Sequence, residues 1–268
     1  MKKVLLALTA IAALSGSAQA ADLAARPYTK APPMAVAPSW TGFYIFGGGG
    51  GGIWDANGGV NSTATGACIV CTNTRPGGDG WFGTVGAGYD WQMNSWVLGI
   101  FADGTFGSLN GNIGDSGVFA GGAATGIVGN EKMQDAWAVG ARLGYLVAPN
   151  VLSYVNAGYT GTYWSGTTLL GSASGLPSGL HTDSFNTGGA FVGGGVENNL
   201  NIFGVTAPGW FMKTEYRASY LDSKTLNERV DGTNALFGRD ITFKPFTQTI
   251  STSLVYRFNW GGPVVAKY

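Results

Sequence analysis

The chain has 268 residues, enough for one large domain or two small ones. Charged residues make up 11% and aromatic residues 13%, which excludes a disordered chain, because disorder accompanies high charge and few aromatic rings. Fifteen basic residues balance fifteen acidic residues, so the chain has no basic field that would attract nucleic acid.

The first twenty residues predict a secretory signal peptide, residues 1–20. Lys2 and Lys3 supply its positive start, Val4–Leu14 is a short apolar core, and Ala18-Gln19-Ala20 is a cleavage site. The apolar run is too short to span a bilayer as a helix, so an uncleaved anchor is the weaker alternative. Residues 21–39 are a Pro/Ala-rich periplasmic lead-in, either polyproline-like or a flexible tail without a role.

Eight strands are expected within residues 40–258, because large apolar side chains alternate there with small or polar ones. The expected strands are Trp40–Trp54, Trp81–Met93, Trp96–Phe106, Met133–Val147, Val151–Trp164, Phe185–Asn198, Trp210–Leu221 and Phe246–Phe258. The first contains the glycine run Gly47–Gly52. Such a run fits a barrel strand where two backbones approach closely.

The segment Trp210–Leu221 shows the alternation most clearly. One face carries large apolar and aromatic side chains, while the other carries Lys213, Glu215 and Arg217 in its middle. A soluble sheet puts its apolar face inward, but here every strand carries a full row of such side chains. A barrel with lipid outside and polar side chains inside accounts for the pattern of all the expected strands. The sequence therefore predicts an all-β fold, an eight-stranded antiparallel transmembrane β-barrel of the outer-membrane type.

Short and long connections alternate between the expected strands. Asn94-Ser95 and Ala148–Asn150 are tight turns, and Asn199–Gly209 is intermediate. The long connections are Asp55–Gly80, Gly107–Lys132, Ser165–Ser184 and Asp222–Pro245. This pattern predicts long loops outside the cell and turns in the periplasm, with both chain ends periplasmic and residues 259–268 as a C-terminal tail.

The tryptophans give a second reason to expect a membrane barrel. Eight of the nine lie at or near the ends of expected strands, and Trp81 and Trp91 are ten residues apart on one face. Ten residues at about 3.3 Å each, tilted by about 40°, rise roughly 25 Å, the height of a barrel's apolar band. We therefore expect the tryptophans at strand ends to form two aromatic girdles.

Charged residues are expected on the inner face in equal numbers of acids and bases. They are Asp90, Asp103, Glu197 and Glu215, with Arg142, Lys213, Arg217 and Arg257. An eight-stranded barrel is just wide enough for side chains to fill, and an unpaired buried charge is costly. Equal numbers predict a lumen filled by an ion-paired charge network, since one sign would dominate in an ion-selective pore.

Few residues offer catalytic or metal chemistry. His181 is the only histidine, and its neighbours Ser178, Asp183 and Ser184 have no spacing specific to a Ser-His-Asp triad. One histidine and two cysteines argue against a zinc site, and the glycine-rich runs lack the lysine of a phosphate loop. We therefore expect no enzyme activity, no catalytic or metal-binding residues and no cofactor.

Cys68 and Cys71 are the only cysteines. A Cys-x-x-Cys pair suggests redox or metal chemistry in the cytosol. Because this chain crosses an oxidising compartment, we expect a disulfide that pins the first outer loop, with two free thiols as the alternative.

Six short segments occur in an order that identifies a family. They are Trp40–Ile45, Gly88–Gln92, Ala141–Tyr145, Gly193–Glu197, Lys213–Tyr216 and Tyr256–Phe258. Together they resemble the opacity-like or outer-membrane immunogenic proteins, small outer-membrane barrels of alphaproteobacteria often labelled porin family proteins. The closing segment Asn259–Val264 is similar to the tail of a rhizobial branch. The longer glycine run, the Asn199–Gly209 connection and the cysteine pair depart from the family pattern.

The resemblance implies a surface-exposed envelope protein of the bacterial outer membrane. Its partners would be outer-membrane lipid, lipopolysaccharide and the barrel-assembly machinery, with no nucleic acid and an unknown partner for the outer loops. Family members end in an aromatic residue that this machinery reads, and both Phe258 and Tyr268 are candidates.

The role we expect is structural, with polar loops presented at the surface and no turnover. Three alternatives stay open. The first is a narrow porin-like channel for small solutes, and the second is a soluble lipocalin-like binding barrel whose charged side chains face water. The third is an outer-membrane enzyme such as a lipase or acyltransferase.

Overall fold

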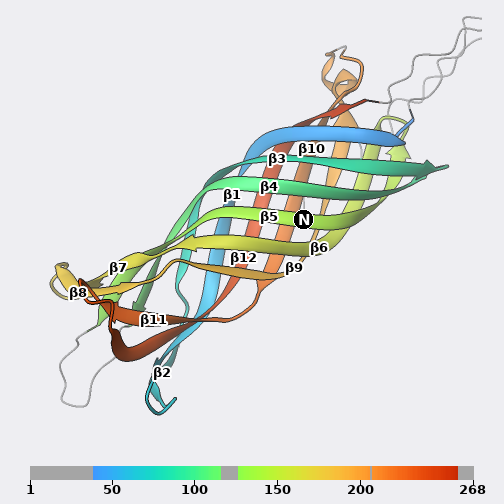
Figure 1. Cartoon of the computed structure of the whole chain (residues 1–268). Helices are drawn as coiled ribbons and strands as arrows, with labels where there is room; N and C mark the ends of the chain where they lie inside the picture. The colour runs from blue at the N-terminus through green and yellow to red at the C-terminus, as the bar shows by residue number, and fades with distance from the viewer. Residues whose placement is uncertain (1–38, 116–125, 206, 259–268) are drawn as a thin grey trace, which may run out of the picture. The chain divides into compact units, whose positions relative to one another are not determined.

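The computed structural model describes residues 39–115, 126–205 and 207–258 as a β-barrel (Figure 1). Its main strands are β1 (Gly42–Ser62), β3 (Gly77–Met93), β4 (Trp96–Asp115), β5 (Ile127–Ala148), β6 (Val151–Ser165), β9 (Phe185–Asn199), β10 (Trp210–Leu221) and β12 (Leu236–Arg257). Within the described residues these eight strands pair antiparallel in the order β1-β3-β4-β5-β6-β9-β10-β12, and β12 pairs back with β1. The predicted eight-stranded barrel is confirmed.

The two faces of each strand are distributed as predicted. On β10, Trp210 and Tyr220 are exposed on the outer wall, whereas Lys213 and Glu215 are buried inside. The soluble lipocalin-like alternative required these charges to face water and is therefore wrong. An outer wall of rings and aliphatic side chains is compatible with hydrocarbon, and a closed ring leaves no unpaired strand edge.

The barrel has two different ends, which we call the turn end and the loop end. The turn end carries the tight connection Asn94-Ser95, the turn after Ala148 and the 3-10 helix η2 (Leu200–Phe203). The loop end carries the four longer connections. The part of the chain that the structure describes contains no helix with the length and apolarity of a membrane span.

The predicted bounds of the four long loops are wrong, because most of their residues form strands. β1 continues to Ser62, β4 continues to Asp115, and β12 begins at Leu236. Further strands form within the connections: β2 (Cys68–Thr74), β7 (Thr167–Gly171), β8 (Pro177–Thr182) and β11 (Lys224–Val230). The wall of the barrel therefore extends well beyond the expected strand ends.

The added strands β7, β8 and β11 continue β6, β9 and β10 after short breaks. They pair in the order β5-β7-β8-β11-β12, so the strand order of the barrel is kept. We call these three strands, with the adjoining ends of β1, β3, β4, β5 and β12, the loop-end tier. The breaks fall at Gly166, residues 183–184 and residues 222–223. Gly, Ser and Asp are turn residues, so their presence there concealed the continuing strands.

The glycine run of β1 forms a continuous strand, as predicted. The β1–β12 ladder extends without interruption from Tyr44 to Ser62. A Cβ atom added at Gly48 would collide with the carbonyl oxygen of Thr252, and one added at Gly50 with that of Ile250. Glycine is therefore needed where β1 bends closely against β12 (Figure 1).

The signal peptide (residues 1–20), the lead-in (residues 21–39) and the tail (residues 259–268) fall almost entirely outside the described residues, and their assignments stay predictions. The same holds for Tyr268. Phe258 lies at the end of β12, where its N–H donates to the carbonyl of Phe43 over 3.0 Å.

Replacing Gly50 by valine should prevent ring closure, because the added atoms meet the β12 backbone. Gly47→Val is the matched control, since a Cβ there has only ordinary contacts, the nearest at 3.8 Å to Val85. Electrophoresis with and without heating measures the folded fraction after refolding. We expect a heat-dependent shift for the wild type and Gly47→Val and its loss for Gly50→Val. Equal shifts in both variants would contradict the close approach.

Candidate functional site: a barrel lumen closed at two levels

Four of the predicted inner charges form one group near the turn end. Arg142 Nε donates to Asp90 Oδ1 over 2.9 Å, and its Nη1 donates to Glu197 Oε2 over 2.9 Å. Arg257 donates to the same two acids, with Nη1 2.8 Å from Asp90 Oδ2 and Nη2 2.7 Å from Glu197 Oε1. Exposure of these four residues is 0% for the acids and 3% for the arginines.

We call this alternating ring of two arginines and two acids the turn-end clamp. Its members come from β3, β5, β9 and β12, so the ion pairs cross the lumen between four strands. Charge-assisted bonds with two-pronged arginine geometry are strong and directional. Each charge therefore has two opposite partners, which is what its removal from water requires.

Aromatic rings cover the turn-end clamp. The Arg142 guanidinium lies 4.4 Å from the ring centre of Tyr44, and that of Arg257 lies 4.4 Å from Trp40. Trp40 packs against Phe211 with ring centres 5.0 Å apart. Trp40 was expected in a girdle, but it is fully buried inside the barrel.

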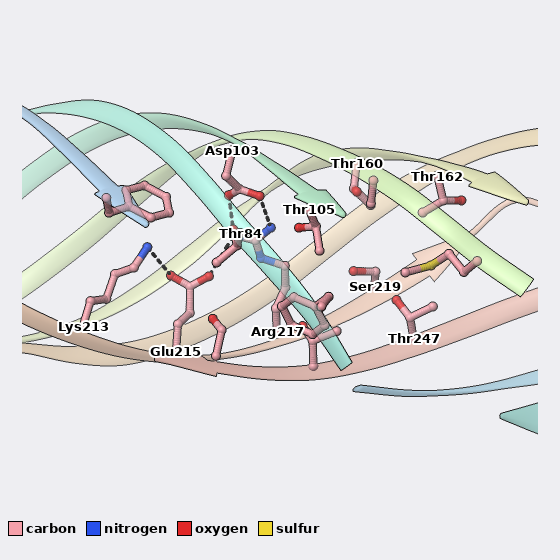
Figure 2. Close-up of a pocket in the computed structure, with 16 residues that line it drawn as sticks. Thr84, Asp103, Thr105, Thr160, Thr162, Lys213, Glu215, Arg217, Ser219 and Thr247 are labelled. Carbon is pink, nitrogen blue, oxygen red and sulfur yellow. Dashed lines mark hydrogen bonds and ion pairs between the residues drawn. The ribbon is translucent and has the colours of Figure 1, made fainter. Parts of the chain in front are cut away.

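The other four predicted charges lie in the middle of the lumen (Figure 2). Arg217 donates to both carboxylate oxygens of Asp103 over 3.0 and 2.7 Å, and to Glu215 Oε1 over 2.8 Å. The Tyr154 hydroxyl donates to Glu215 Oε2 over 2.8 Å. Lys213 Nζ is 3.7 Å from Glu215 Oε2 and 3.4 Å from the ring centre of Phe46. This mid-lumen cluster also balances two acids with two bases.

A cavity of about 50 Å³ adjoins the mid-lumen cluster (Figure 2). Hydroxyl side chains supply most of its polar lining: Thr84, Thr105, Thr160, Thr162, Ser219, Thr247, Thr249 and Ser251. Its size and its polar walls suit a few water molecules. We call it the hydroxyl chamber.

An aromatic cluster fills the lumen on the loop-end side. Trp54 lies edge-on to Trp164 and Phe243, at ring-centre distances of 5.3 and 5.6 Å, and Trp164 is 5.2 Å from Phe243. All three side chains are at most 2% exposed. The indole nitrogens donate to Leu109 O over 3.2 Å and to Thr162 Oγ1 over 2.9 Å. We call this group the loop-end plug.

The girdle prediction is therefore only partly right. The outward tryptophans are Trp81, Trp91, Trp96, Trp137 and Trp210, all exposed on the outer wall. Trp54 and Trp164 lie inside instead, and the alternation itself contained this signal. Trp164 has the same strand parity as the polar Thr162, which is buried inside the barrel.

Sequence reasoning missed Glu131 on β5. Its side chain is fully buried, and neither carboxylate oxygen has a hydrogen-bond partner among the described residues. It lies six residues beyond the outward-facing Trp137 toward the loop end, which places it outside the membrane band. Burial raises the pKa of this carboxyl to about 8.

His181 lies in the loop-end tier, but it does not form the triad that its neighbours in sequence allowed. The Ser178 hydroxyl donates to the carbonyl of Leu169 over 2.7 Å, and the imidazole faces Asp231 and Asn234. Among the described residues there is no group of three or more His, Cys, Asp or Glu placed to hold a metal ion. The side chains of Cys68 and Cys71 lie outside the described residues, so the disulfide stays a prediction.

A closed ring of eight antiparallel strands, with rings outside and charges inside, defines an outer-membrane β-barrel. The chain belongs to the outer membrane protein beta-barrel domain family, whose model matches residues 6–258. The 31 kDa outer-membrane immunogenic proteins of Brucella melitensis biotype 1 and Brucella suis biovar 1 are each 30% identical to it over 278 residues, which cover 96% of this chain and 100% of theirs. The expected resemblance and the bacterial outer-membrane location are confirmed.

Similar solved structures include an outer membrane protein and a surface protein. OprG from Pseudomonas aeruginosa is 10% identical, covers 81% of this chain and 98% of its own, and has a TM-score of 0.48. Neisserial surface protein A is 12% identical, with the same coverage of 81% and 98% and a TM-score of 0.34.

Removing one arginine from the turn-end clamp should strongly destabilise the barrel. Arg142→Met leaves Asp90 and Glu197 each with one partner fewer, and breaking a buried ion pair costs about 3–5 kcal/mol. Urea unfolding of the refolded protein measures the loss. Arg75→Met, at an exposed position, is the control and should change stability by less than about 0.5 kcal/mol. Equal midpoints for the two variants would contradict a structural role of the clamp.

Glu131 should make stability depend on pH. Its folded pKa of about 8 lies above the ordinary glutamate value of 4.5, so its neutral form is favoured in the native state. The stability that this provides is complete below pH 4.5 and is lost as the pH rises to 8.

Glu131→Gln removes this ionisation. The free energy of unfolding of the variant, measured in urea, should therefore fall less between pH 5 and pH 9 than that of the wild type. The expected difference is on the order of a few kcal/mol. Parallel pH dependences in the two proteins would show that Glu131 is not a buried acid in solution.

Proposed function

We propose that the protein is a closed, non-conducting surface barrel that holds a rigid β-structured tier above the outer membrane. The observation that carries this proposal is the burial of two groups in the lumen, the turn-end clamp and the loop-end plug. The turn-end clamp blocks one side of the hydroxyl chamber, and the loop-end plug blocks the other. Both are built from side chains that are nearly inaccessible to solvent.

The charge balance of the lumen supports closure over conduction. A selective pore concentrates one sign of charge along its path. Here the turn-end clamp and the mid-lumen cluster each contain two acids and two bases, and the acids accept hydrogen bonds from bases of their own group. A passing ion would have to break pairs that the interior cannot rehydrate.

The lengths of the strands support a surface role. β4 has 20 residues and β5 has 22. At about 3.3 Å per residue and a tilt of about 40°, such strands rise roughly 50 Å, about twice the height of the apolar band. With the turn end in the periplasm, the loop-end tier stands beyond the lipid head groups. The name of the Brucella relatives, immunogenic proteins, is in line with exposure at this surface.

The outer wall would contact outer-membrane lipid and lipopolysaccharide through its exposed rings, and the assembly machinery would act during insertion. We propose no catalytic turnover, because the imidazole of His181 faces an acid and an amide instead of the Ser178 hydroxyl.

One observation favours a narrow channel as the second candidate. The hydroxyl chamber is polar, and the mid-lumen cluster borders it (Figure 2). Conduction would require the turn-end clamp and the loop-end plug to open together, since each of them closes the lumen by itself.

Planar-bilayer recording of the refolded protein distinguishes the two candidates. We expect no conductance steps from the wild type, from Arg257→Ala or from Trp54→Ala/Phe243→Ala, because one seal remains in each. The variant with all three substitutions should conduct. Heat-dependent electrophoretic migration must show that every variant is folded. Steady wild-type steps that change when Glu215 is replaced by glutamine would establish the channel instead.

A further inference from the structure

His181 lies at the seam between two parts of the loop-end tier. One part is the hairpin of β7 and β8, and the other is β11 with the turn that leads into β12. Only three residue pairs join β8 to β11, and His181 opposite Arg229 is the middle pair. A ladder this short depends on the side chains around it, because few backbone hydrogen bonds connect the two parts.

We propose that His181 is an acid-sensitive latch that ties the β7–β8 hairpin to the turn between β11 and β12. Both ring nitrogens reach across the seam. Nδ1 lies 2.7 Å from Asp231 Oδ1, and Nε2 lies 3.2 Å from Asn234 Oδ1. Asp231 and Asn234 belong to the turn, whereas the imidazole belongs to β8.

The two acceptors select the protonated ring. A carboxylate oxygen only accepts a hydrogen bond, and so does an amide oxygen, so both ring nitrogens donate when Asn234 Oδ1 faces Nε2. Only the imidazolium has two N–H groups. In the neutral ring one nitrogen becomes an acceptor, and Asn234 must turn its amide group to keep a bond. Histidine is the side chain whose charge changes between pH 5 and 8.

Further charged groups lie around the imidazole. Asp183, which follows β8, has Oδ1 4.0 Å from Nε2, and its Oδ2 accepts from Arg229 Nε over 2.6 Å. Arg229 on β11 also donates to the carbonyl of Asn234 over 2.9 Å. Asp183, Asp231 and Arg229 together carry one net negative charge, which the imidazolium neutralises. Protonation of His181 in acid therefore strengthens its contacts with the charged groups on both sides of the seam.

A latch of this kind would stiffen the exposed tier in acid and loosen it at neutral pH. The change is confined to the β8–β11 seam. The ladders of β9 with β10 and of β10 with β12 are longer, and His181 is not part of either. His181 is the only histidine of the chain. Glu131 on β5 also changes its charge as the pH rises toward 8, so a variant at His181 is needed to assign a transition to the seam.

Hydrogen exchange of the full refolded barrel tests the latch. After correction for the intrinsic pH dependence of exchange, we expect amides of residues 179–182 and 228–231 to gain about three- to tenfold protection from pH 7.5 to pH 5.5. Amides of the β9–β10 ladder serve as the internal control and should not change.

Two variants separate the latch from a general effect of acid. His181→Gln should abolish the gain while keeping the protection that the wild type has at pH 7.5. Asp231→Asn keeps the size of the side chain but removes its charge, and it should reduce the gain. An equal gain in wild type and His181→Gln would overturn the proposal, and so would a wild type whose seam does not respond.

Discussion

Hydrocarbon offers the backbone no hydrogen-bond partner, and the rest of the structure depends on this constraint. Every strand inside the membrane must be paired on both sides, so the sheet has to close on itself. Closure occurs where β1 meets β12, over an uninterrupted ladder from Tyr44 to Ser62. The glycines of β1 matter because they let the strand bend against its partner without a collision.

A closed ring of eight strands then determines what the interior can hold. The lumen is only wide enough for side chains, and each charge within it needs an opposite partner. The turn-end clamp meets this requirement by placing Arg142 and Arg257 between Asp90 and Glu197. Aromatic rings close both sides of the polar middle. In the function proposed above, these layers make the barrel a sealed support and leave exposed chemistry to the loop-end tier.

The loop-end tier keeps the strand order of the membrane barrel. Its backbone need not be fully paired, because water can form hydrogen bonds with the N–H and C=O groups there. Its strands are accordingly interrupted, at Gly166 and at two further breaks. Side chains take part in holding its seams, and the contact of His181 with Asp231 is one of them. Sequence reasoning placed this region in loops, since turn residues at the breaks end the alternation on which strand prediction relies.

The sequence by itself determined which way each strand faces, because side-chain alternation is a local property with a period of two residues. From it followed the eight strands, the outward Trp81 and Trp137 and the inward position of all eight charges. Only the tertiary structure decided which charges meet. Asp90 and Arg257 are 167 positions apart, and their contact depends on the register of strands that lie across the lumen from each other. The burial of Glu131 and the use of Trp54 as a plug were decided in the same way, by what the opposite wall supplies.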